Sequence, residues 1–144
     1  MGKGKGVFTL QFDRRLPIYQ QGVERIQELI ASQEWPSGST VPSRRELAQE
    51  LSINPNTAQR IYRVLEDKGW IITERNVPSR VTEDEEKIKA LRKELSQTAL
   101  KDLVDRLKRL GNSVEDITNY LKQESQDLEK EAKESNGGGK HVNR

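Results

Sequence analysis

Hydrophobic residues near the start of the chain recur at steps of three and four, the spacing of one face of an α-helix. The stretch opens at Leu16-Pro17, where the missing N–H of an early helical proline costs no hydrogen bond. It continues to about Glu34, and the turn-forming segment 35–38, WPSG, follows. We therefore expect a helix whose apolar stripe faces a core; the stripe is Tyr19, Val23, Ile26, Leu29 and Ile30.

The segment 41–70 predicts two short helices joined by a tight turn. Ser43 and Glu46 have the spacing of a capping box, so the first helix begins there. Asn54 is a favourable N-cap for the second helix, and Pro55 occupies its first position. The second helix runs to about Lys68 and ends at Gly69. The apolar faces of the two helices consist of Leu47, Ala48 and Leu51, and of Ala58, Ile61, Tyr62 and Leu65.

A β-hairpin is predicted after Gly69. Residues 70–73 are β-prone, residues 76–79 have turn composition, and residues 80–82 return as a second short strand. This hairpin would form a wing beside the two short helices.

The second half of the chain predicts two longer helices. A capping box at Thr82 with Glu85 begins the first, of about 28 residues, and Gly111-Asn112 ends it. Ser113 caps the second helix, and the tail from Ser135 is expected to be disordered. Both helices carry an apolar stripe.

The predicted fold class is mostly α (α+β), with three parts. Residues 1–82 form the winged helix-turn-helix domain, residues 83–134 a two-helix antiparallel hairpin, and residues 135–144 the disordered tail. Two helices alone rarely make an independent core, so the hairpin is expected to associate with a second copy. The stripe expected to form the dimer contains Leu91, Leu95, Leu103, Leu107, Leu110, Ile117 and Leu121.

The second helix of the pair carries polar side chains opposite its apolar face. These are Asn56, Gln59, Arg60 and Arg63. Asn and Gln can bind adenine through two hydrogen bonds, and Arg can bind guanine or a phosphate. A helix-turn-helix places such a face in the major groove of DNA. The alternative interpretation is an ordinary solvated polar face.

The same residues resemble a known family. The motifs VPSRRELAQEL, INPNT and Tyr-Arg-x-Leu-Glu-x-x-Gly-Trp look like the DNA-binding domain of GntR-type bacterial transcription regulators, and NPNTAQRIYRVLE resembles their short YtrA-like branch. The match covers roughly Leu16 to Val81. The resemblance implies a winged helix-turn-helix that binds operator DNA as a dimer, with a short two-helix C-terminal part for dimerisation. It also implies a target promoter near the protein's own gene, often one driving a transporter operon.

The wing departs from the family pattern. The family usually has a glycine-rich wing tip, whereas Arg75-Asn76-Val77-Pro78 stands here. Asn76 tolerates a left-handed turn, so we still expect a hairpin, with Arg75 and Arg80 contacting phosphate or the minor groove. Solvated surface arginines are the alternative. Together with residues that match the family's contact region, the predicted DNA-binding set is Arg44, Arg45, Asn54, Pro55, Asn56, Thr57, Gln59, Arg60, Arg63, Arg75, Asn76 and Arg80.

Composition narrows the function classes. Of 144 residues, 33% are charged and 32% hydrophobic, and the net charge is +2. Residues 1–81 contain 12 Lys/Arg against 9 Asp/Glu, so the basic bias lies with the predicted DNA-binding domain. There is no cysteine, and the single histidine, His141, lies in the predicted tail, so no nucleophile–base pair or metal site is expected. The sequence therefore predicts no enzyme, no cofactor and no metal.

Targeting signals are also lacking in the sequence. We find neither an apolar run long enough to span a membrane nor a signal peptide at the N-terminus, so a cytoplasmic protein is expected. The larger GntR branches can carry a metal or organic-acid pocket in a C-terminal domain several times this size, and only two helices stand in its place here. The sequence does not identify a small-molecule effector.

The sequence thus predicts a dimeric, sequence-specific DNA-binding regulator, a repressor that occupies an inverted-repeat operator. A winged-helix module that docks a partner protein without binding DNA is the first alternative. An architectural protein that binds DNA without sequence preference is the second; it would show a steep salt dependence but no preferred site.

Overall fold

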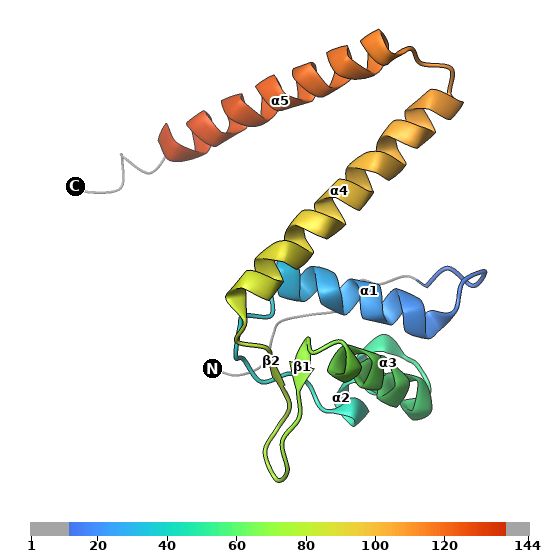
Figure 1. The fold of residues 1–144 in the computed structure, drawn as a ribbon, viewed down its shortest axis with the longest axis vertical. Helices are drawn as coiled ribbons and strands as arrows, with labels where there is room; N and C mark the ends of the chain where they lie inside the picture. Colours follow the sequence, from blue (N-terminus) through green and yellow to red (C-terminus); the bar gives the residue numbers. More distant parts are fainter. Residues whose placement is uncertain (1–11, 138–144) are drawn as a thin grey trace. The chain divides into compact units, whose positions relative to one another are not determined.

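The computed structural model describes residues 12–137, which form five helices and one two-stranded sheet (Figure 1). They divide into two compact units, and the division falls after Ser96. The elements in chain order are α1 Ile18–Ala31, α2 Arg44–Leu51, α3 Pro55–Asp67, β1 Ile71–Ile72, β2 Arg80–Val81, α4 Glu85–Arg109 and α5 Val114–Gly137.

The core of the first unit lies where α3 packs against both α1 and α2. The apolar stripes predicted for these helices are buried there, as their periodicity requires, except that Tyr19 of α1 is only partly buried. The strand residues Ile71 and Val81 close the core on the hairpin side, with 1% and 0% of their surface exposed. The largest fully buried side chains are Trp35, Tyr62, Ile26, Leu29, Ile30, Leu47, Ile61 and Leu65.

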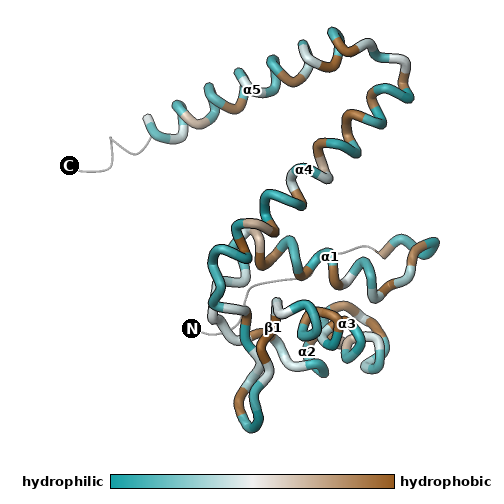
Figure 2. Tube along the Cα trace, in the orientation of Figure 1, coloured by the Kyte–Doolittle hydropathy of each residue, from teal (hydrophilic) through white to brown (hydrophobic). Residues whose placement is uncertain are grey.

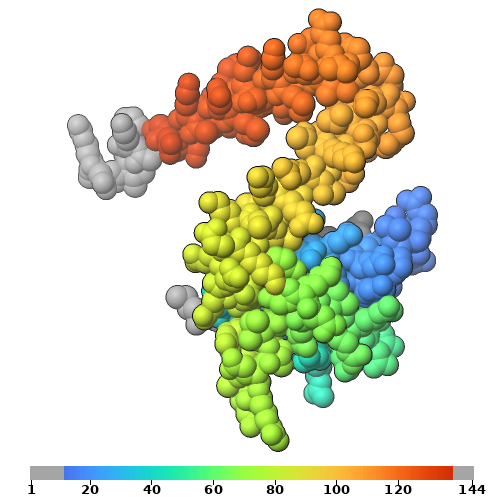
Figure 3. All heavy atoms as spheres, viewed as in Figure 1, coloured from blue at the N-terminus to red at the C-terminus, as the bar shows by residue number. Residues whose placement is uncertain are grey.

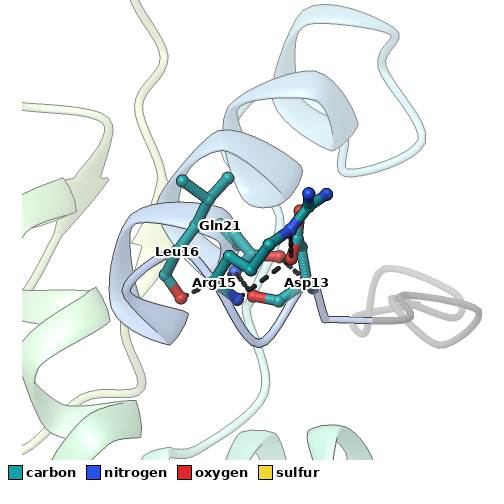
Figure 4. A network of polar contacts seen from close by, with 4 residues as sticks. All are labelled: Asp13, Arg15, Leu16 and Gln21. Atoms are coloured by element: carbon teal, nitrogen blue, oxygen red, sulfur yellow. Dashed lines mark hydrogen bonds and ion pairs between the residues drawn. The ribbon is translucent and has the colours of Figure 1, made fainter.

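The start of α1 is held by a polar network in place of a side-chain cap (Figure 4). Pro17 is the N-cap residue rather than the first helical residue, and it offers no capping hydrogen bond. Gln21 reaches back instead: its Nε2 donates to the carbonyl oxygens of Asp13 (2.7 Å) and Leu16 (3.1 Å), and its Oε1 accepts from Asp13 N (2.7 Å). The backbone N and the guanidinium of Arg15 donate to the Asp13 carboxylate at 3.0–3.1 Å, and these bonds lower the pKa of that carboxyl.

The end of α1 comes at Ala31, earlier than the predicted end near Glu34. The Ser32 hydroxyl donates to Leu29 O (3.1 Å), and Gln33 adopts a left-handed conformation with φ 66°. Trp35 N donates to the same Leu29 carbonyl at 3.0 Å. Local side-chain and turn bonds therefore replace the last helical turn that periodicity alone predicted.

The boundaries predicted for α2 and α3 are confirmed. Ser43 Oγ accepts from Glu46 N at 3.1 Å, and Asn54 Oδ1 accepts from Asn56 N at 2.8 Å. Gly69 has φ 78°, the left-handed conformation in which glycine ends a helix. Between the helices, Ser52 takes the left-handed position (φ 52°) that turns α2 into α3.

The hairpin after α3 is the predicted wing, although its strands are shorter than the sequence suggested. Antiparallel pairing joins Ile71 to Val81 and Ile72 to Arg80. The segment before α2 extends the sheet on the other side, because Thr40 forms a β-bridge with Arg80. Asn76 has φ 66°, so the expected left-handed turn residue is confirmed.

The start of α4 differs from the sequence prediction. Asp84 Oδ1 accepts from Lys87 N at 3.0 Å, so Asp84 caps the helix rather than Thr82. Thr82 is buried, and its hydroxyl accepts from Asp84 N at 3.1 Å. The helix is thus capped two residues later than predicted, because the Thr82 side chain is buried in the core.

The first turns of α4 belong to the first unit, which corrects the predicted domain boundary at residues 82/83. Ile88 and Leu91 are buried in the core of that unit, with 1% and 4% of their surface exposed, and Leu95 packs against it. Arg92 Nε donates to Ala31 O at 2.7 Å. Leu91 therefore cannot serve the dimer interface to which the sequence assigned it, and Leu95 is already partly covered.

The second unit contains the end of α4 and all of α5. Gly111 turns the chain with φ 93°, and the capping box that begins α5 is reciprocal: Asp116 N donates to Ser113 Oγ (3.1 Å) and Ser113 N to Asp116 Oδ2 (3.0 Å). The helix continues to Gly137, so residues 135–137 are helical rather than part of a disordered tail. The rest of that predicted tail lies outside the described residues.

Apolar residues recur at intervals along the otherwise hydrophilic helices of the second unit (Figure 2). Several of their side chains are exposed. Leu103 is 46% exposed, Leu110 71% and Leu121 37%. Leu107 is half-buried, and Ile117 is buried within the chain (6%), so Ile117 is not a free interface residue as predicted. Within residues 12–137, no helix combines the length and apolar character needed to cross a membrane.

Candidate nucleic-acid interface

The outward face of α3 is polar and cationic, as its sequence predicted. Asn56, Gln59, Arg60 and Arg63 are all exposed, while Ala58, Ile61, Tyr62 and Leu65 on the opposite side are buried. A shallow groove of about 390 Å³ runs along the exposed side. It is lined by Asn56, Gln59, Arg60, Arg63, Val64 and Asp67.

Arg60 contacts the neighbouring helix α1. Its guanidinium lies 3.6 Å from the centroid of the Tyr19 ring, a close cation–π contact. The sequence predicted Tyr19 in the core stripe and Arg60 on the polar face of α3, with no contact between the two. The aromatic ring instead orients the guanidinium and leaves its N–H edges available to a base or phosphate.

The start of α2 lies beside the end of α3. Arg44 Nη2 donates to Glu66 Oε1 at 2.7 Å, and the Arg44 guanidinium lies 5.7 Å from the Tyr62 ring centroid. Arg45, the next residue, is exposed. The two arginines that the sequence grouped together thus differ: Arg44 has an internal partner, whereas Arg45 projects into solvent.

Tyr62 of α3 holds the segment just before α2 from the core side. Its hydroxyl donates to Pro42 O at 2.5 Å, and 1% of its surface is exposed. Burial raises the pKa of the Tyr62 hydroxyl, an effect that Arg44 partly opposes. Tyr62 therefore stays protonated and keeps its hydrogen bond across the physiological pH range.

The first turn of α3 presents the remaining predicted contact residues. Asn54, Pro55 and Asn56 are exposed, and Thr57 is half-buried. The Asn54 side-chain oxygen caps the helix, and the NH2 group of the same side chain can still donate to a further hydrogen bond. The N-terminal N–H groups of a helix favour a phosphate nearby.

The wing projects from the helices of the first unit (Figure 3). Arg75 and Asn76 are exposed at its tip. Arg80 is paired internally, since its Nη2 lies 2.9 Å from Glu74 Oε1, and this contact lowers the pKa of the Glu74 carboxyl and raises that of Arg80. Arg75 is therefore the better placed of the two predicted wing arginines for an external phosphate.

A cleft of about 590 Å³ separates the wing from the start of α2. Arg44 and Arg45 line one side, and Thr73, Val77, Pro78 and Ser79 line the other. The exposed α3 face, the α2 start and the wing are thus three parts of one unit of the chain.

Several residues were not assigned to this surface from the sequence. Tyr19, Glu66, Thr73 and Glu74 each hold a predicted DNA-binding arginine or the wing. Glu66 lies on the same side of α3 as Gln59, seven residues earlier, which is a weak signal. Its partner Arg44 lies 22 residues away, and no local spacing predicts that contact.

A helix-turn-helix with a cationic polar second helix, followed by a wing, defines this chain as a winged-helix DNA-binding protein. The family model for bacterial regulatory proteins of the gntR family matches residues 18–81. The HTH-type transcriptional regulator YhcF of Bacillus subtilis, itself uncharacterised, is 32% identical over 112 residues, which cover 78% of this chain and 93% of YhcF. The chain belongs to the GntR family.

Two further similar proteins are consistent with this family assignment. The HTH-type transcriptional repressor YtrA of Bacillus subtilis is 36% identical over 77 residues, 52% of this chain and 59% of YtrA. A solved GntR family transcriptional regulator from Listeria monocytogenes is 33% identical with a TM-score of 0.70, and the match covers 78% of this chain and 98% of that one. The protein is therefore a DNA-binding transcription regulator of the GntR family and not an enzyme.

Proposed function

We propose that the protein is a homodimeric repressor that occupies an inverted-repeat operator. In this proposal α3 enters the major groove, and Asn56, Gln59 and Arg63 contact base edges. Arg45 and the wing residue Arg75 bind phosphates on either side. The observation that supports this most strongly is the exposed α3 face, where the polar side chains stand clear of the core beneath them.

Dimerisation would use the second unit. Leu103, Leu110, Leu121 and Leu128 are exposed there, between 37% and 71% of their surface. Burying a leucine side chain contributes roughly 1.5–3 kcal/mol, and a two-fold dimer doubles each contribution. Several such residues can offset the entropy of association.

Repression is the sign of regulation that the relative YtrA favours. YtrA is a transcriptional repressor and shares 36% identity over 77 residues of this chain. A winged-helix dimer that covers its operator blocks access to a promoter by occupancy alone, without a catalytic step. The protein would act on double-stranded DNA in the cytoplasm, with no cofactor.

Selection of bound duplexes from a random pool tests the proposal. We expect an inverted repeat whose half-sites lie about one helical turn, or a multiple of it, apart. Binding that falls steeply with salt but selects no sequence would instead indicate an architectural protein. Absence of DNA binding at low salt would favour the module that docks a partner protein.

A further inference from the structure

The carboxylate of Glu66, at the end of the α3 reading helix, connects that helix to two other elements. Its Oε1 accepts from Arg44 Nη2 of α2 (2.7 Å) and from Thr73 Oγ1, just after β1 (2.8 Å). The same Thr73 oxygen lies 2.8 Å from Ser79 Oγ on the other side of the hairpin. Because Thr73 donates its single proton to Glu66, Ser79 is the donor of that second bond.

These side-chain bonds lie just beyond the last paired strand residues of the wing. The strand ladder reaches outward to Ile72, and on the far side the last sheet-like bond joins Val41 N to Ser79 O (2.9 Å). Thr73 and Ser79 come next along the hairpin, toward the tip that carries Arg75. The Glu74–Arg80 pair joins the two sides of the hairpin to each other, whereas the contacts of Thr73 and Ser79 also join the hairpin to Glu66 of α3. The direction in which the wing leaves the sheet therefore depends in part on Glu66.

An acidic residue at a DNA-binding surface opposes binding because it repels phosphate, and pairing with a cation such as Arg44 reduces that repulsion. The Glu66 side chain is 26% exposed, and Arg44, its partner, is 41% exposed. The carboxylate is thus occupied by internal donors beside a surface that needs positive charge. These internal bonds are those expected of a side chain that positions its neighbours at the surface.

We propose that Glu66 is a positioning residue for DNA binding, which holds the wing and Arg44 in fixed places relative to α3. The wing arginine Arg75 then reaches the DNA while the α3 side chains are in the groove. The inference rests on the proposed function, because it needs both the α3 face and the wing to contact DNA.

A matched pair of variants distinguishes the positioning role of Glu66 from the effect of removing a negative charge. Glu66→Ala and Asp67→Ala each remove one carboxylate from the last turn of α3, but Asp67 is exposed and lines the outer groove. We expect Glu66→Ala to bind the selected operator about five-fold or more weakly than Asp67→Ala, a typical size for coupled contacts. Equal affinities for the two variants would overturn the inference.

A double-mutant cycle with the wing gives the decisive readout. Arg75→Ala should weaken operator binding in the wild-type protein but have little further effect when Glu66 is alanine, because the wing is then no longer held in place. Thr73→Val serves as a second background, since it removes the wing bond and keeps the Arg44–Glu66 pair. It should abolish the Arg75 effect while the melting temperature stays close to wild type. An undiminished Arg75 effect in both backgrounds would overturn the inference.

Gln59→Ala distinguishes failure of the inference from failure of the proposed function. If Gln59→Ala weakens operator binding while Glu66→Ala and Asp67→Ala behave alike, the inference alone is wrong. If no preferred duplex is selected and Gln59→Ala has no effect, the proposed function and the inference are both wrong.

Discussion

Arg60 is a single side chain that both contacts a neighbouring helix and lies on the proposed DNA-binding face. Its guanidinium lies over the Tyr19 ring at 3.6 Å, and the Tyr19 hydroxyl accepts a hydrogen bond from Gln20 Nε2 at 3.2 Å. Arg63, one turn further along α3, is exposed on the same outward face. The two arginines are therefore expected to respond differently to substitution.

Arg63→Ala should weaken operator binding without changing thermal stability, whereas Arg60→Ala should reduce both. An exposed cation–π contact contributes about 0.5–1 kcal/mol, which corresponds to a fall of roughly 2–8 °C in the melting temperature of a domain this size. Thermal melting and DNA titration of both variants provide the measurement. Tyr19→Phe keeps the ring and serves as the control; melting of Arg60→Ala at the wild-type temperature would show that the contact does not stabilise the fold.

At the wing tip, Arg75→Ala should lower affinity for all duplexes more than it changes base preference. A phosphate contact is independent of sequence, and its loss lowers the salt slope of binding by about one. Titrations at several salt concentrations measure the slope. Arg80→Ala, which removes an arginine already paired with Glu74, is the control and should have the smaller effect. Unchanged affinity and slope for Arg75→Ala would leave the tip arginine as a solvated residue.

Among the elements, the first turns of α4 depart most from the sequence prediction. Its first turns contribute Ile88 and Leu91 to the core of the first unit, and Lys87 Nζ donates to Lys68 O and lies 4.5 Å from the Trp70 ring centroid. Helix α4 therefore completes the winged domain before it continues into the second unit.

A chain ending at Ser96 should fold cooperatively, whereas a chain ending at Val81 should be severely destabilised. Removal of the two core residues of α4 costs roughly 1.5–3 kcal/mol each in lost burial, a large part of the stability of a small domain. Circular dichroism with thermal melting distinguishes the two. A Val81 chain that melts like the Ser96 chain would show that α4 is dispensable for the domain.

The elements that local chemistry specifies could be predicted from the sequence. Ser43, Asn54 and Gly69 define the ends of α2 and α3 through bonds within a few residues, so their spacing was sufficient. The Arg44–Glu66 pair and the packing of Leu91 could not be predicted, because they join segments distant in the chain. The same apolar stripe on α4 fits a domain core or a dimer interface, and periodicity cannot divide it between the two.

For the whole molecule, the exposed leucines of the second unit lead to a prediction about assembly. Leu110→Glu and Leu121→Glu should each convert a dimer to a monomer, because a charge would be buried at the interface. Lys122→Glu, a charge change at the exposed position of α5 next to Leu121, is the control and should remain dimeric. Sedimentation at micromolar concentration measures the state, and a wild-type protein that sediments as a monomer would contradict the proposed assembly.

The central claim is that two copies of α3 read two related half-sites together. Once one winged domain is bound, the second contact becomes effectively intramolecular, which raises avidity by about 10² or more. The most direct test compares binding to the selected operator with binding to the same duplex in which one half-site is scrambled. The proposal predicts two protomers on the intact operator and an affinity loss of about 100-fold on the scrambled one. One protomer bound with equal affinity to both duplexes would contradict it.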